Sequence, residues 1–151
     1  MPSFQPLKDS QIAIATRLYD NLPGWKLYEE TLKSLNVEFP GYELPATLLK
    51  VTAINQFYST SLYAVMRMAE HITAVMANPP ANYDAELVEK LAALPIETEG
   101  ETKRRFTSFA SKFAHFFISQ DNYPIMDKYS EKMVAFHTKT LLAPTYLLSK
   151  I

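Results

Sequence analysis

The sequence predicts an all-α protein, a compact multi-helix single domain over residues 1–151. Apolar residues recur with the 3.6-residue period of a helix along most of the chain. Only three glycines occur, and no Asn-Gly or Asp-Gly pair marks a hairpin between strands. Hydrophobic residues make up 48% of the chain and charged residues 21%, a composition that can bury a core.

The first two helices are expected at residues 10–22 and 25–36. Asp9 or Ser10 precedes the first apolar stripe and is the expected N-cap. Pro23-Gly24 is the expected end of the first helix, because proline and glycine interrupt helices. The next stretch, VEFPGYELP, contains two prolines and a glycine and is expected to form a loop.

Residues 46–77 have a helical pattern that is longer than most globular helices. In its middle lies the run Tyr58-Ser59-Thr60-Ser61, and Ser and Thr prefer helix caps to helix interiors. We therefore expect two helices, 46–57 and 61–77, with Thr60 or Ser61 as the cap of the second. The second of them is apolar on most sides and is expected to be the most buried helix.

Three further helices are expected. The first spans about 84–94, the second begins between residues 101 and 108 and ends at Ile118, and the third spans about 126–142. Pro79-Pro80 ends the long helical stretch before them. After Pro144 the sequence TYLLSKI forms a short apolar tail. We expect this tail to pack on the domain or on a partner, including a second copy of the chain.

Several classes of site and location are not expected. The chain has no cysteine, which excludes disulfides and thiolate ligands or nucleophiles. The three histidines lack the i, i+4 spacing of a helical metal pair, so neither a metal nor another cofactor is predicted. A secretory leader and an apolar run of about 18 residues are both absent, so a cytoplasmic protein without a membrane span is expected.

The charge is distributed unevenly along the chain. Residues 1–100 hold seven Lys and Arg against twelve Asp and Glu, whereas residues 101–151 hold eight against four. Residues 101–151 contain the only basic run, Lys103-Arg104-Arg105. Such a run can bind DNA phosphates even on a chain of net charge −1. The alternative is a solvated first turn of the following helix.

The segment FASKFAHFFISQDNYPIMD, residues 109–127, carries the residues with the clearest chemical potential. Lys112 lies among aromatic residues, and Asp127 is placed at the start of the next helix. A desolvated amine and a carboxylate held at a helix N-terminus are the components of an amine-nucleophile enzyme. The alternatives are that Lys112 extends to solvent, that Asp127 is only an N-cap and that the phenylalanines form core.

Two segments in order resemble the helix-hairpin-helix DNA glycosylase superfamily, which includes 8-oxoguanine DNA glycosylase/lyases. The first segment, residues 48–72, is similar to that family's helix, polar elbow and second helix. The second, residues 108–134, is similar to its lysine-bearing helix and the following apolar-Pro-apolar-Asp turn. The chain also resembles small uncharacterised bacterial helical proteins with SFA-(S/T)-K and YPI-x-D signatures.

The resemblance implies a helix-hairpin-helix glycosylase-like bundle that binds DNA as a base-excision glycosylase/lyase. Lys112 then corresponds to the nucleophile and Asp127 to the assisting aspartate. Asn55 and Gln56 hold the place of the elbow residue that enters the duplex, and Lys103, Arg104 and Arg105 would contact phosphates. The alternative is a non-catalytic protein-interaction module with the same fold that uses the apolar C-terminal tail. A small-molecule pocket lined by Tyr58, Tyr63 and the Phe cluster is a third possibility.

Overall fold

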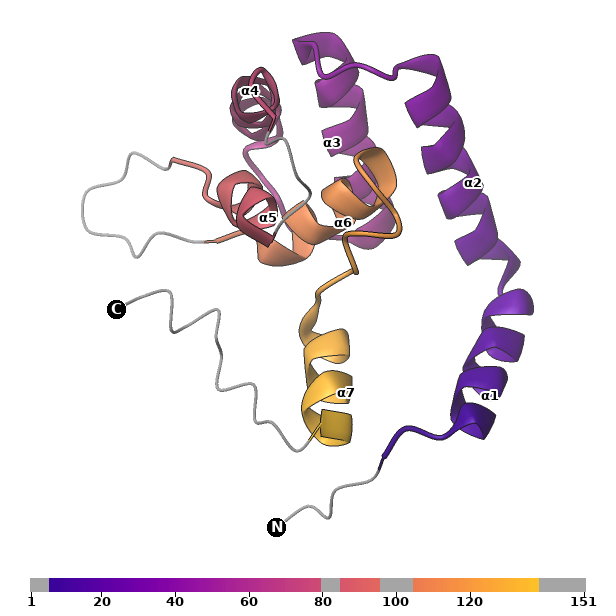
Figure 1. Cartoon of the computed structure of the whole chain (residues 1–151). Coiled ribbons are helices and arrows are strands. Elements are labelled where there is room, and N and C mark those ends of the chain that lie inside the picture. Colours follow the sequence, from indigo (N-terminus) through magenta and orange to yellow (C-terminus); the bar gives the residue numbers. More distant parts are fainter. Residues whose placement is uncertain (1–5, 80–84, 96–104, 139–151) are drawn as a thin grey trace, which may run out of the picture. The chain divides into compact units, whose positions relative to one another are not determined.

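The computed structural model describes residues 6–79, 85–95 and 105–138, and these residues form helices joined by loops (Figure 1). No strand occurs among them, which confirms the all-α prediction. The seven helices in the described residues are α1 (Asp9–Asp20), α2 (Pro23–Glu38), α3 (Leu44–Tyr58), α4 (Val65–Met76), α5 (Ala85–Ala92), α6 (Thr107–Phe117) and α7 (Lys128–Thr138). The predicted tail after Pro144 lies outside the described residues.

The chain divides into two compact units. The first comprises Met1–Lys26 and Met126–Ile151, and the second comprises Leu27–Ile125. The first unit therefore holds α1 and α7, whereas the second holds most of α2 together with α3 to α6. The single domain expected over residues 1–151 stays a prediction.

The boundary between α1 and α2 differs from the expected one. Pro23 was expected to end the first helix, but it is the first residue of α2. Proline is tolerated there because the backbone N–H that it lacks would have no partner in the first turn of a helix. Lys8, and neither Asp9 nor Ser10, is the N-cap of α1. Its backbone N–H donates to Oε1 of Gln11 at 2.9 Å, which satisfies a group at the helix start.

The break between α3 and α4 lies where the Ser and Thr run predicted it. We call residues 59–64 the elbow. Ser59 and Ser61 have left-handed backbones with φ of 47° and 56°. The N-cap of α4 is Ala64, so the expected cap at Thr60 or Ser61 is wrong. The left-handed residues turn the chain first, and α4 begins only after that turn is complete.

The core of the second unit centres on α6. Eight of its residues are buried, against four in α4, so the prediction that residues 61–77 form the most buried helix is wrong. Helix α4 also packs against α3 and α5, but α6 is buried on more than one side, because its buried residues run almost without a break from Phe109 to Phe117. Phe109, Phe113 and Phe117 follow one another along α6, with ring centroids 6.1 and 5.1 Å apart. The Phe cluster is therefore core, as one interpretation of the sequence held.

Candidate functional site

Lys112 is a buried lysine on α6, and its side chain is 5% exposed. Its Nζ donates to the hydroxyl of Ser108 at 2.8 Å and to the carbonyl of the same residue at 3.3 Å. Ser108 precedes Lys112 by one helical turn, so both bonds hold the amine against the N-terminal half of α6. The alternative interpretation, in which Lys112 extends into solvent, is therefore wrong.

The amine of Lys112 also reaches the end of α3. Its Nζ lies 5.8 Å from the centroid of the Tyr58 ring. Tyr58 is the last residue of α3, directly before the elbow, and its ring stacks on Phe116 with centroids 5.6 Å apart. The fold thus brings together two segments that are more than fifty positions apart in the sequence. The amine that the sequence singled out therefore lies near Tyr58, the residue that directly precedes the elbow.

Asn55 fixes the shape of the elbow. Its Oδ1 accepts the backbone N–H of Leu62 at 3.0 Å and the hydroxyl of Thr60 at 2.8 Å. Its Nδ2 donates to the carbonyl of Leu62 at 2.9 Å. Both ends of the Asn55 amide are therefore engaged inside the protein. Its neighbour Gln56 is exposed on the surface of α3.

Tyr63 is the most prominent side chain of the elbow that sequence reasoning did not assign to DNA. It is 91% exposed, the highest value among the exposed large hydrophobic side chains of the described residues. A side chain this exposed lines no enclosed pocket, and the Phe cluster lies in the core, so neither supports the small-molecule pocket that was the third possibility. The sequence signal was available, since an aromatic residue follows the Ser and Thr run at the helix break.

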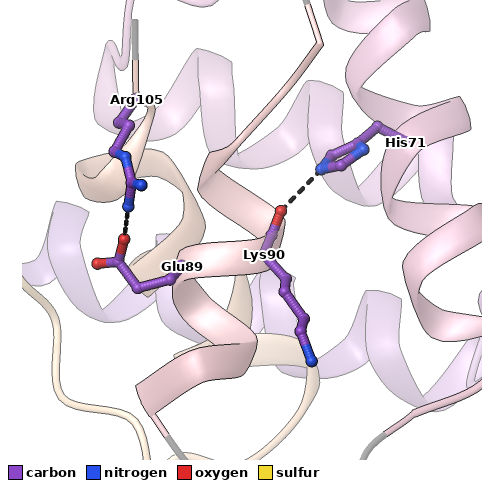
Figure 2. A network of polar contacts seen from close by, with 4 residues as sticks. All are labelled: His71, Glu89, Lys90 and Arg105. Carbon is purple, nitrogen blue, oxygen red and sulfur yellow. Dashed lines mark hydrogen bonds and ion pairs between the residues drawn. The ribbon is translucent and has the colours of Figure 1, made fainter. Parts of the chain in front are cut away.

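The basic run is only partly described. Lys103 and Arg104 lie outside the described residues, so their expected role stays a prediction. Arg105 forms an ion pair with Glu89 of α5, and Figure 2 shows the two side chains facing one another. The pair links α5 to the residues just before α6, so part of the Arg105 charge is compensated within the protein.

Two further polar side chains of α4 hold the C-terminal end of α5. His71 Nε2 lies 2.8 Å from the carbonyl oxygen of Lys90, as Figure 2 shows. Arg67 donates from Nη2 to the carbonyl of Pro95 at 2.5 Å. The Lys90 carbonyl lies in the last turn of α5 and also accepts the backbone N–H of Ala93 at 3.3 Å, whereas Pro95 lies three residues beyond the helix. Arg67 and His71 thereby fix where the connection from α5 to α6 leaves α5.

Asp127 is placed in the first unit, whereas Lys112 is in the second. Asp127 is the N-cap of α7, with Oδ1 accepting the backbone N–H groups of Tyr129 and Ser130, each at 2.9 Å. The hydroxyl of Ser130 accepts the N–H of Asp127 in return at 2.8 Å. This reciprocal arrangement is a capping box. The N-cap interpretation of Asp127 is therefore confirmed, and its pairing with Lys112 stays a prediction.

Comparison with known proteins identifies a family. The family model HI_0787_N, described as an N-terminal domain, matches residues 11–122. The chain belongs to the HI_0787_N family. The match includes Lys112, the elbow and Arg105, whereas Asp127 lies beyond it. No curated protein and no solved structure matches the chain.

Within the HI_0787_N match lies a second buried lysine, Lys50 of α3, which sequence reasoning missed. Its side chain is fully buried, and Nζ donates to the carbonyl of Gly41 at 3.0 Å. The amine lies 4.8 Å from the ring centroid of Tyr42 and 5.2 Å from that of Phe117. Desolvation lowers the pKa of Lys50 to about 8, although the charge of Glu43 opposes the shift.

Tyr42 closes the same cluster from the other side. Its hydroxyl donates to the carbonyl of Phe117 at 2.5 Å, which joins the loop before α3 to the last residue of α6. Lys50 and Tyr42 together therefore hold this loop onto α3 and α6. A lysine between apolar positions of a helix usually extends to solvent, so the sequence contained no signal that separated Lys50 from a surface lysine.

Neither a metal site nor a membrane span is found in the described part of the chain. No three His, Asp or Glu side chains there cluster in a way that could hold a metal ion. Two of the histidines instead contact backbone carbonyls, since His115 Nδ1 lies 2.8 Å from the carbonyl oxygen of Tyr123 and His71 contacts Lys90. No described helix has the length and apolar character that crossing a bilayer requires.

Proposed function

We propose that this protein binds DNA through its elbow and acts on a damaged or abasic nucleotide with Lys112 as the amine nucleophile. The observation that carries the proposal is the contact between Lys112 and Tyr58, with Nζ 5.8 Å from the ring centroid. A shielded amine thus lies near the ring of the residue that directly precedes the elbow. A lyase that extrudes a nucleotide needs a wedge and a nucleophile in this proximity.

The elbow supplies the wedge. Tyr63 is 91% exposed, and the backbone beneath it is held by the three hydrogen bonds of Asn55. An aromatic side chain presented on a fixed turn can stack on an unpaired base, and such stacking contributes about 1–3 kcal/mol per base. Gln56 lies exposed at the end of α3 and can donate to or accept from base edges or phosphate oxygens.

The amine supplies the chemistry. In the proposed reaction Nζ of Lys112 attacks the aldehyde carbon C1′ of an abasic site, and the loss of water gives a Schiff base. Removal of a proton from C2′ then breaks the bond to the 3′ phosphate, which leaves as an anion. Because Lys112 is 5% exposed, the side chains that cover its amine would have to move when DNA binds. Asp127, as an N-cap, is favoured in its ionised form and would accept protons or stabilise positive charge on the sugar.

Borohydride trapping on an abasic-site duplex tests the proposal, because reduction turns a Schiff base into a permanent crosslink. We expect a crosslink with the wild type and with Lys33→Ala, which removes an exposed lysine of α2. We expect no crosslink with Lys112→Ala, and circular dichroism should show that this variant retains its helices. A crosslink that persists in Lys112→Ala would refute the assignment of the nucleophile. Absence of a wild-type crosslink, under conditions that trap a known lyase, would refute the reaction.

A non-catalytic protein-interaction module is the second candidate. One observation favours it, namely that Lys112, Arg105 and Asp127 all have structural partners within the protein. Salt-sensitive DNA binding without trapping would instead indicate a DNA-binding module. If neither trapping nor DNA binding were observed, the interaction module would remain as the function.

A further inference from the structure

A hollow of about 300 Å³ lies between the loop that precedes α3 and the C-terminal end of α4. Two of its lining residues, Tyr42 and Glu43, come from the loop, and the other three, Thr73, Met76 and Ala77, come from the end of α4. All five belong to the second unit, so the walls of the hollow come from one unit alone. Its volume is at the lower end of the range found for small-molecule pockets.

Glu43 brings an unpaired carboxylate to this hollow. The side chain is folded back over Gly41, where an added Cβ atom would lie only 2.8 Å from Cδ of Glu43. The charges of Glu43 and Lys50 attract one another, yet Nζ of Lys50 donates to the carbonyl of Gly41. Among the described residues no hydrogen bond or ion pair engages the carboxylate of Glu43, so it can accept donors from a ligand.

The end of α4 favours positive charge at the same place. Thr73 and Met76 lie in its last turn and Ala77 is its C-cap, and the carbonyl oxygens of a last helical turn carry partial negative charge. No basic side chain of α4 lies in this turn to compensate that charge. The hydroxyl of Thr73 is also buried without a hydrogen-bond partner among the described residues, and such a group is stabilised when a donor reaches it.

We propose that this hollow binds a small organic amine, with its ammonium group on the Glu43 carboxylate and its apolar body against Met76 and the Tyr42 ring. An ammonium group has three donors, which the carboxylate and the Thr73 hydroxyl can accept, whereas the carboxylate would repel an anion. A cavity of about 150 Å³ holds benzene, so the larger hollow has room for one ring with a short amine chain. The site uses neither Lys112 nor the elbow and is independent of the DNA reaction.

An NMR titration of the full ¹⁵N-labelled chain with 2-phenylethylamine at neutral pH tests the site. We expect saturable shifts of the backbone amides at residues 42–43 and 73–77. The neutral probe 2-phenylethanol and the variant Glu43→Gln should each weaken binding about tenfold or more, because the charge-assisted hydrogen bond is lost. Glu38→Gln, at an exposed position of α2, should bind the amine like the wild type. Absence of saturable shifts, shifts confined to other residues, or equal binding of amine and alcohol would overturn the proposal.

Gly41→Ala gives a second test that keeps the carboxylate but moves it. The added methyl group would occupy the place of the Glu43 carboxyl group, which is the end of a flexible side chain and can swing away while the fold is retained. Binding of 2-phenylethylamine should therefore weaken as it does in Glu43→Gln, with an unchanged circular dichroism spectrum. Gly24→Ala is the matched control, because an added Cβ there meets nothing within 4 Å. Wild-type affinity in either Gly41→Ala or Glu43→Gln would overturn the assignment of the ammonium group to Glu43.

Discussion

Asn55 bonds both the N–H and the C=O of Leu62 through one side-chain amide, with donor–acceptor distances of 3.0 and 2.9 Å. The side-chain amide of Asn55 thus supplies hydrogen-bond partners to both backbone groups of Leu62, which lies outside any helix. Leu62 is 2% exposed, so these two polar groups have little access to water and depend on Asn55.

Asn55→Ala should destabilise the fold. It removes three hydrogen bonds at about 1 kcal/mol each and leaves the Leu62 backbone groups without these partners, so we expect a loss of roughly 2–4 kcal/mol. Urea unfolding followed by circular dichroism would measure it. Gln56→Ala, at the exposed neighbouring position, should change stability by less than about 0.5 kcal/mol. Equal effects of the two substitutions would contradict this role of Asn55.

Lys50 should make the stability of the protein rise with pH. The folded state releases the Lys50 proton near pH 8, whereas the unfolded chain holds this proton up to about pH 10.5. Between these values the unfolded state binds more protons, so the free energy of unfolding increases as the pH rises. Relative to Lys50→Met, the wild type should gain about 2–3 kcal/mol between pH 7 and pH 10, at 1.36 kcal/mol per pKa unit.

Lys33→Met is the matched control for that measurement, since Lys33 is exposed on α2. Its unfolding free energy should follow that of the wild type at every pH. If the difference between wild type and Lys50→Met were constant from pH 7 to pH 10, the lowered pKa of Lys50 would be wrong.

Tyr63→Ala separates DNA binding from stability. Because the side chain is 91% exposed, its removal should change the unfolding free energy by less than about 0.5 kcal/mol. Loss of one stacking contact should weaken binding to an abasic-site duplex roughly fivefold to a hundredfold. Fluorescence anisotropy at fixed salt would measure it, with Tyr129→Ala as the control in the other unit. Unchanged affinity in Tyr63→Ala would remove the elbow from the DNA-binding surface.

Phe113→Ala should be among the most damaging single substitutions. The residue is fully buried in the middle of α6 and contacts the rings of Phe109 and Phe117. Removing such a ring costs about 3–5 kcal/mol through lost burial and the cavity that remains. Thermal unfolding should show a large fall in Tm, whereas Val37→Ala on the surface of α2 should show almost none. A small effect at Phe113 would mean that the core does not centre on α6.

The sequence predicted local features of the fold better than tertiary ones. The helix break at the elbow was predictable, because Ser and Thr compete locally for backbone hydrogen bonds. The role of Pro23 was not, since the same residue can end one helix or begin the next. The burial of α6 also escaped prediction, because it depends on which helices pack around it.

In the candidate site, too, features set by local sequence were predictable and contacts between distant segments were not. Lys112 and Asp127 were recognised from their local sequence, and the N-cap role of Asp127 follows from its position before α7. The contact of Lys112 with Tyr58 was not predictable, because it joins residues that are far apart in the chain. Lys50 was missed because its neighbours along α3 are those of many surface lysines, whereas the groups around its amine, Gly41, Tyr42 and Phe117, come from other parts of the chain.

The two left-handed serines of the elbow have a consequence for how its shape is maintained. Among the described residues, Ser59 and Ser61 are the non-glycine positions with positive φ, a conformation that costs about 1 kcal/mol for each such residue. Glycine at either position would remove that strain, yet it would also let the turn sample many more conformations. The protein therefore gives up some stability in return for a turn that is already in one shape before anything binds to it.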